Sequence, residues 1–187
     1  AASADGPIAP AQPKGASDLD LSRPTKVAIQ RVGSDFQQLV MACAAEEPDV
    51  HMEVLELPNP DSFFTWHVLF QTSGFDDPLA KQLRTAGEPG VLLELQFPND
   101  FPYSPPFVRV IKPELDGGFV LPRGGLCMEA LSSSGWAPAT RIEGLLQAIR
   151  AHMLEGQVKL RTGSGGGTYC TEGAKRDFDW AMNKHGW

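Results

Sequence analysis

The segment from Phe97 to Trp136 constrains the fold more than any other part of this chain. It begins with a proline-rich entry, FPNDFPYSPP, which the interior of a helix cannot accommodate, so we expect an ordered loop there. A short apolar run, FVRVIK, follows with the composition of a strand. A loop bounded by glycine pairs then leads to Cys127, nine positions before Trp136. Whether Cys127 is a nucleophile or a small core residue decides what the protein does.

Length and composition indicate one globular domain preceded by a linker. Of the 187 residues, 42% are hydrophobic and 21% are charged, which suffices for a hydrophobic core. Residues 1–21 are rich in Ala, Pro, Gly, Ser and Asp, so we expect disorder there and a folded domain over 22–187. The net charge of −7 disfavours nucleic acids and anionic membranes as partners. No apolar run approaches the ~20 residues of a membrane span.

The cysteines do not form the pattern of a disulfide framework. They are odd in number and widely spaced, which favours a reducing compartment, the cytosol or the nucleus. Cys43 lies on an apolar helical stripe and Cys170 in a predicted flexible loop, so we expect neither to react. A free cysteine is commonly a buried structural thiol, but the glycines shortly before Cys127 and its loop position favour exposure.

Apolar periodicity predicts a helix followed by four strands. The helix runs from about residue 24 to 47, because apolar side chains recur there at steps of three and four. They are Ile29, Val32, Phe36, Leu39 and Cys43. Alternating apolar residues predict strands over 50–57 and 91–97, aromatic and β-branched residues predict one over 62–71, and a short apolar run predicts one over 107–112. A polar insertion, 72–90, interrupts this meander with a short helix that starts at Asp77-Pro78-Leu79.

Two further helices are predicted after Cys127. The first covers 140–155, with Thr140 and Glu143 as a capping box. Its buried stripe comprises Ile142, Leu145, Leu146, Ile149 and Leu154. A flexible glycine-rich segment, 163–167, precedes a last helix over 172–184, which turns Phe178 and Met182 toward the domain and stops before Gly186. The fold class is therefore α+β: a four-stranded antiparallel meander with an N-terminal helix and C-terminal helices.

Three motifs in a fixed order resemble the ubiquitin-conjugating enzyme family. They are FPNDFPYSPP at 97–106, LCMEAL at 126–131 and WAPATRIEGLLQAI at 136–149. The resemblance covers about 23–187 and implies the ubiquitin-conjugating fold. The Gly-Gly-aromatic-Val-Leu approach to the cysteine, the insertion at 72–90 and the terminal His-Gly-Trp further resemble the Q-type members of that family.

The resemblance implies a thioester reaction at Cys127. The activating enzyme passes the carboxyl terminus of ubiquitin to this thiol, and a ligase of RING or other type brings the protein substrate. Sulfur suits both steps, because a thiolate is a strong nucleophile and a thioester has a good leaving group. No metal and no organic cofactor are implied, since the activating enzyme consumes the ATP upstream.

The sequence departs from most relatives because it lacks the tripeptide His-Pro-Asn before the cysteine. Neither His nor Asn occurs between Pro113 and Leu126, and Phe119 stands eight positions before Cys127, about where the Asn would be. A phenyl ring donates no amide N–H, and losing one oxyanion donor costs ~3 kcal/mol in a site that depends on it. Q-type members share this feature. The acceptor is therefore expected to be either a lysine or a hydroxyl group.

Further roles follow from the resemblance by position. We expect Glu129 to hold the active-site loop, and Trp136 to pack beneath it with its N–H on a backbone partner. Tyr103, Pro138 and Ala139 stand where relatives present an apolar patch to RING-type ligases; the alternative is that they only stiffen their loops.

Three other titratable residues are weaker candidates for the site. Asp116 is the nearest carboxylate upstream of the cysteine, but sequence distance says little about its geometry. We expect His152 on a helix surface. His185, beside the terminal Gly186-Trp187, either folds back near the site or lies packed or in solvent, and we expect the latter.

Two alternatives to an active conjugating enzyme for ubiquitin remain open. The first is a non-catalytic module of the same fold that binds ubiquitin or a ligase; the missing Asn favours it, and Cys127 in a matching motif disfavours it. The second is a conjugating enzyme for another ubiquitin-like modifier, which no residue discriminates.

Overall fold

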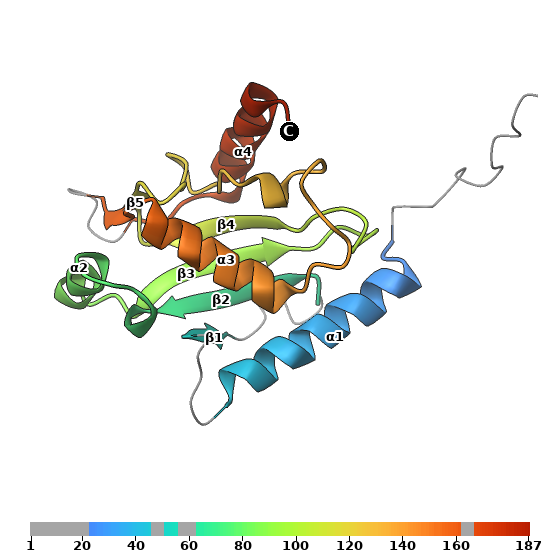
Figure 1. The fold of residues 1–187 in the computed structure, drawn as a ribbon, viewed down its shortest axis with the longest axis horizontal. Coiled ribbons are helices and arrows are strands. Elements are labelled where there is room, and N and C mark those ends of the chain that lie inside the picture. Colours follow the sequence, from blue (N-terminus) through green and yellow to red (C-terminus); the bar gives the residue numbers. More distant parts are fainter. Residues whose placement is uncertain (1–22, 46–50, 56–62, 162–166) are drawn as a thin grey trace, which may run out of the picture.

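An antiparallel sheet with helices around it forms the framework of the protein (Figure 1). The computed structural model describes residues 23–45, 51–55, 63–161 and 167–187. Four strands pair in sequence order and all pairs are antiparallel. They are β1 (Met52–Val54), β2 (Thr65–Gln71), β3 (Gly90–Gln96) and β4 (Phe107–Lys112). The predicted meander and the α+β class are confirmed.

Helices surround this sheet on several sides. In Figure 1, α3 (Ile142–Glu155) crosses the strands, α1 (Lys26–Cys43) lies toward β1, and α4 (Thr171–His185) stands beyond β4. The insertion forms α2 (Leu79–Ala86), at the predicted start, after a 3-10 turn, η1 (Thr72–Gly74). Among the described residues, none of the helices combines the length and apolar character that a membrane crossing requires.

Some predictions from the sequence fall on residues outside the described ranges. These are the disorder of 1–21, the ends of the first two predicted strands and the flexible segment at 163–167, of which only residue 167 is described. A small second sheet was not predicted. It pairs β5 (Leu115–Asp116) with β6 (Lys159–Leu160) and is too short to leave a periodic signal.

The hydrophobic core lies between one face of the sheet and α3. Alternate side chains of the strands point to this face, as the two-residue period requires. The buried set includes Trp66, Val68, Phe70, Leu93, Leu95, Val108 and Val110 from the sheet. From α3 it includes Ile142, Leu145, Leu146, Ile149 and Met153. Met153, not the predicted Leu154, completes the stripe because it follows Ile149 by one helical step of four; Leu154 is half-buried.

The predicted start and stripe of the first helix are partly wrong. Ile29 is 52% exposed, whereas Ala28 and Val32 are fully buried, so the stripe is shifted by one residue at its start. The helix begins at Lys26 because the hydroxyl of Thr25 accepts a hydrogen bond from the Ala28 N–H at 3.1 Å. The helix ends at Cys43, earlier than predicted.

The predicted capping box of α3 is also wrong. Its N-cap is Arg141, which makes no side-chain capping bond. Thr140 lies in the preceding turn, where its carbonyl accepts from Arg31 Nη2 at 2.6 Å. This contact joins residues 109 positions apart, so no local pattern could indicate it. The last helix agrees with the prediction within one residue at each end, and Phe178 packs against the core.

Arg109 on β4 connects the sheet to the segment that leads into α4. Its Nε donates to Glu94 Oε1 at 2.8 Å, and its Nη1 donates to the Tyr169 carbonyl at 3.0 Å. Burial opposes ionisation of Glu94, but hydrogen bonds from Arg109, His67 and Gln96 outweigh it, so the pKa of Glu94 lies below its ordinary value. The buried ion pair therefore anchors the start of α4.

Glu94→Gln should lower the free energy of unfolding by about 1–2 kcal/mol at pH 7, because a charged partner of buried Arg109 is lost. The lowered pKa makes this contribution present above the ordinary pKa of a glutamate and lost as pH falls through the folded value. Urea unfolding at several pH values measures it. Glu53→Gln, at an exposed carboxylate on β1, is the control and should stay within about 0.5 kcal/mol. A Glu94 effect that does not shrink in acid would contradict this interpretation.

Candidate active site

Cys127 is held by a loop whose backbone enters the left-handed region three times in succession. Gly117, Gly118 and Phe119 have φ values of 78°, 62° and 61°. Glycine adopts such values readily, whereas for phenylalanine the conformation costs about 1 kcal/mol. The turn closes through a hydrogen bond from the Val120 N–H to the Gly117 carbonyl at 3.1 Å. The strained residue is thus the one that stands at the expected Asn position.

The backbone of Phe119 binds the backbone of the cysteine directly. The Cys127 N–H donates to the Phe119 carbonyl at 2.9 Å, and Val120 forms an antiparallel bridge with Leu126. Within the same loop, the Gly124 carbonyl accepts a hydrogen bond from the Val110 N–H at 2.8 Å, which joins the loop to β4. The thiol is half-buried at the end of this hairpin-like segment.

The turn after α3 packs against the loop that precedes Cys127. The Gly118 N–H donates to the Gly156 carbonyl at 2.9 Å. A Cβ at Gly118 would lie 2.5 Å from Val158 Cβ, and one at Gly156 would lie 2.7 Å from Gly118 Cα. These contacts explain why glycine occupies both positions, since any side chain would separate the loop from α3.

A pocket of about 390 Å³ opens beside Cys127. Its lining comes from the loop, from α3 and from the end of α4: Phe119, Cys127, Met128, Glu129, His152, His185 and Trp187. The Phe119 and His152 ring centroids are 5.1 Å apart, and His185 stacks on Trp187 at 4.7 Å. Two imidazoles therefore face the same pocket as the thiol, and no carboxamide side chain of the described residues lines it.

The sequence leads us to expect His152 on a helix surface and His185 packed or in solvent, and it does not bring the two together at this pocket. His152 lies on the pocket side of α3, and His185 is brought to the pocket by the end of α4. Gly186 reverses the chain there with φ of 72°, and the Trp187 N–H donates to the Met182 carbonyl at 3.0 Å. A glycine after a helix signals such a reversal in the sequence. The surface on which it places the flanking His and Trp depends on how α4 packs.

Burial raises the pKa of the Cys127 thiol above its ordinary value, and the nearby charge of Lys184 offsets this in part. Little thiolate is therefore present at neutral pH in the unliganded protein. Cys43 is half-buried and Cys170 is exposed at the N-cap of α4; both are free. That neither reacts stays a prediction.

The other expected site residues fall into distinct places. Glu129 has an exposed side chain at the pocket, and its carbonyl accepts from the Ser132 N–H and hydroxyl in the turn η2 (Glu129–Leu131). Trp136 is buried, and its Nε1 donates to the Pro102 carbonyl at 2.6 Å. Asp116 does not line the pocket and bonds to Arg161 Nε at 2.9 Å.

Tyr103, Pro138 and Ala139 are exposed on two neighbouring loops. Tyr103 is 66% exposed, and the bond between Trp136 and Pro102 joins its loop to the loop of Pro138. Asp35 on α1 is buried, and its Oδ2 accepts a hydrogen bond from Arg31 Nε at 3.0 Å. Arg31 Nη1 in turn donates to the Pro138 carbonyl at 3.1 Å. No pattern in the sequence indicates this link between α1 and the loop.

No group of three or more His, Cys, Asp or Glu side chains in the described part of the chain is arranged to hold a metal ion. The pocket beside the thiol offers imidazoles, an indole and one carboxylate instead. Of these groups, the imidazoles and the carboxylate are of the types that accept and donate protons next to a sulfur nucleophile.

Comparison with known proteins gives a family model and several relatives that match this chain. The family model described as "Ubiquitin-conjugating enzyme" matches residues 91–160. A human Q-like ubiquitin-conjugating enzyme protein is 32% identical over 132 residues, which are 68% of this chain and 82% of that protein. The human "Ubiquitin-conjugating enzyme E2 Q1" is 34% identical over 140 residues, 71% of this chain and 33% of that protein.

A fruit-fly relative and a solved structure extend the comparison. A Q-like ubiquitin-conjugating enzyme protein of Drosophila melanogaster is 41% identical over 106 residues, 57% of this chain, and this chain spans only 34% of its length. The crystal structure of a ubiquitin-conjugating enzyme E2 from Plasmodium falciparum matches with a TM-score of 0.51 and 16% identity. The match covers 67% of this chain and 96% of that one, and shows a shared fold.

Lys184→Gln should raise the pKa of Cys127 further, because a nearby positive charge is removed. At pH values below the pKa of Cys127, we expect its alkylation to slow by about twofold, which is the effect of one screened charge. Iodoacetamide labelling as a function of pH, read at the Cys127 peptide by mass spectrometry, measures this. Lys175→Gln is the matched control, since Lys175 on the same helix lies over the Phe107 ring. Equal profiles for both variants would show that Lys184 does not act on the thiol.

Proposed function

This chain belongs to the ubiquitin-conjugating enzyme family and is of the Q type, and we propose that it carries ubiquitin as a thioester on Cys127. The observation that supports this most is a half-buried thiol, fixed by backbone bonds, at a pocket with two imidazoles. Phe119, Glu129 and Trp136 support the loop around it. No metal or organic cofactor takes part in this proposal.

Charging is an exchange of thioesters. Cys127 Sγ forms a bond to the carboxyl-terminal carbon of ubiquitin, while the bond from that carbon to a sulfur of the activating enzyme breaks. The proton of Cys127 is released and the departing thiolate takes one up. Because burial raises the pKa of Cys127, the thiol needs a proton acceptor or a nearby positive charge when it attacks. His185 and His152 face the pocket, and Lys184 supplies a positive charge close by.

Transfer to the acceptor needs proton removal as well. A lysine or hydroxyl nucleophile attacks the thioester carbon, its proton goes to a base, and Cys127 leaves as thiolate. An imidazole suits this role because its charge changes near neutral pH. Of the two histidines, we assign the base to His185, because its side chain is exposed, whereas that of His152 is half-buried.

Other partners follow from the family. We propose that the activating enzyme loads this chain, and that a ligase of RING or other type docks on the exposed loops of Tyr103, Pro138 and Ala139. The link from Asp35 through Arg31 to Pro138 supports this, because it would hold the two loops and α1 as one surface. Three free cysteines suit the reducing cytosol or nucleus.

Incubation with activating enzyme, ATP and ubiquitin should give an adduct on a non-reducing gel that a thiol reductant removes. Cys127→Ser should give an oxyester that survives reduction, because oxygen replaces sulfur in the same position. Cys43→Ser and Cys170→Ser are the matched controls and should charge as the unmodified chain does. An adduct that forms only with another ubiquitin-like modifier would show that this chain carries that modifier in place of ubiquitin. If no adduct forms with any modifier, the enzymatic proposal fails and the non-catalytic binding module is the remaining alternative.

His185→Asn should slow discharge of the charged protein to free serine or threonine by at least about tenfold, since a positioned base contributes ~10²–10⁴-fold. Charging itself should change less. Single-turnover discharge to serine, threonine and lysine measures this. His51→Asn is the control, because His51 contacts Ser73 at 3.3 Å and does not line the pocket. Discharge by lysine alone would exclude the hydroxyl acceptor.

A further inference from the structure

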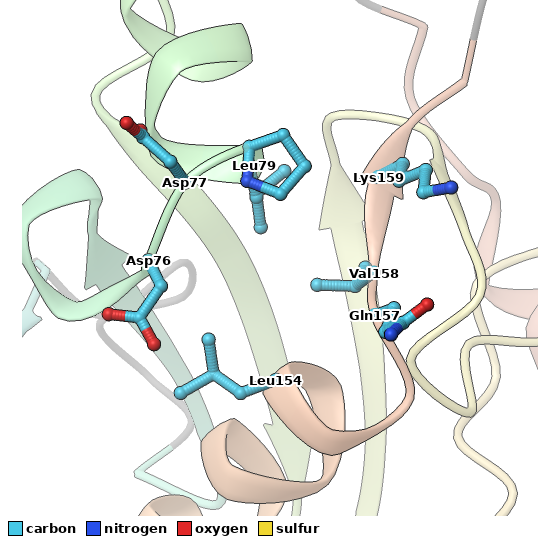
Figure 2. A pocket seen from close by; sticks show the side chains of 8 residues that line it. Asp76, Asp77, Leu79, Leu154, Gln157, Val158 and Lys159 are labelled. Atoms are coloured by element: carbon cyan, nitrogen blue, oxygen red, sulfur yellow. The ribbon is translucent and has the colours of Figure 1, made fainter.

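A second pocket lies between the start of α2 and the turn that follows α3 (Figure 2). Its volume is about 390 Å³, within the range of ~300–1,000 Å³ typical of ligand pockets. The lining residues are Asp76, Asp77, Pro78, Leu79, Leu154, Gln157, Val158 and Lys159. None of them lines the pocket beside Cys127. The insertion at 72–90 supplies one of its two walls.

Apolar side chains line the space between these walls. Leu79 and Val158 are each 2% exposed, and Leu154 is half-buried. In Figure 2, Leu79 lies above the space, Leu154 on α3 lies below it, and Val158 extends into it from the right. An aliphatic side chain inserted here would leave water and contact apolar groups on both sides.

The rim of the pocket on the α2 side is acidic. Asp76 and Asp77 are both exposed there. Asp77 contacts Arg84 at 3.3 Å, but both side chains are more than half exposed, so this pair is weak. Asp76 has no ion-pair partner among the residues that the structure describes. Lys159 is exposed on the opposite wall, so the acidic character is confined to the α2 side. There, two carboxylates beside the apolar slot are complementary to an aliphatic side chain that is followed by a lysine or arginine.

The pocket also shares a wall with the active-site loop. Val158, which faces the slot, lies against Gly118, where a Cβ would come within 2.5 Å of it. Gly118 directly precedes Phe119, whose carbonyl binds the Cys127 amide. A segment seated in the slot would therefore lie next to the support of the catalytic cysteine.

We propose that this pocket docks a short segment of a partner protein that presents an aliphatic side chain next to a lysine or arginine. The insertion thereby has a role separate from thioester chemistry: it recruits a partner beside the active-site loop. The apolar slot provides affinity, and the carboxylates select the neighbouring basic residue.

Binding of capped model peptides to the ¹⁵N-labelled full chain tests this. The probe is acetyl-Gly-Leu-Lys-Gly-amide, with acetyl-Gly-Leu-Glu-Gly-amide and acetyl-Gly-Ser-Lys-Gly-amide as matched peptides. We expect the probe to shift the amide signals of Asp76, Leu79, Val158 and Lys159 in a saturable manner. The glutamate peptide should bind about fivefold more weakly and the serine peptide about tenfold more weakly.

Two double variants separate recognition of the lysine at this pocket from general attraction of a basic peptide to an acidic protein. Asp76→Asn with Asp77→Asn should weaken binding of the lysine probe by about fivefold, as expected for exposed charges. Glu172→Gln with Asp179→Asn removes the same charge from exposed positions on α4 and should leave binding unchanged. The amide spectrum away from the pocket reports whether each variant is folded.

Two results would overturn the proposal. One is the absence of saturable shifts at the lining residues up to about 10 mM peptide, where even a very weak site would begin to fill. The other is equal weakening by both pairs of substitutions. Because the experiment uses neither ubiquitin nor the activating enzyme, its failure is independent of any failure of Cys127 to form a thioester.

Discussion

The hydrogen bond from the Cys127 amide to the Phe119 carbonyl organises the candidate active site. It requires Phe119 to hold φ of 61°, which glycine would adopt far more easily. Gly118 lets the chain reach this conformation while in contact with Val158 in the turn after α3. The cysteine is thus positioned by backbone atoms of a loop that lies against the core, and the Phe119 ring is left to pack on His152.

The end of the C-terminal helix, α4, contributes to the pocket beside Cys127. Arg109 ties the Tyr169 carbonyl to the sheet, and α4 starts two residues later, so its end lies in a defined place relative to Cys127. Gly186 then returns Trp187 to the pocket, where it stacks with His185. The two imidazoles at the pocket therefore come from α3 and α4, whereas the loop before the cysteine carries neither His nor Asn. The backbone support of the thiol and the imidazoles that face it thus belong to different parts of the fold.

The sequence predicts the sheet well and the site only in part. The strand Phe107–Lys112 has the predicted bounds, because it is rich in β-branched and aromatic residues and proline precedes it. The capping box at Thr140 fails because α3 begins one residue later, with Arg141 as its N-cap, and Thr140 lies in the preceding turn, where its carbonyl binds Arg31. Motif order indicates Cys127, but it could not indicate His152 and His185, whose positions depend on how α3 and α4 pack. The pocket at α2 is invisible to periodicity for the same reason, since its walls lie about 80 positions apart in the chain.

Amide hydrogen exchange at Cys127 tests the organisation of this site most directly. If the bond to Phe119 holds the loop against the turn after α3, the amide should exchange on the order of a hundredfold or more slowly than in an unstructured peptide. NMR on the unmodified chain gives this rate, with the exposed amides of the same spectrum as reference. Exchange of the Cys127 amide at the rate of an unstructured peptide would contradict a backbone-held cysteine.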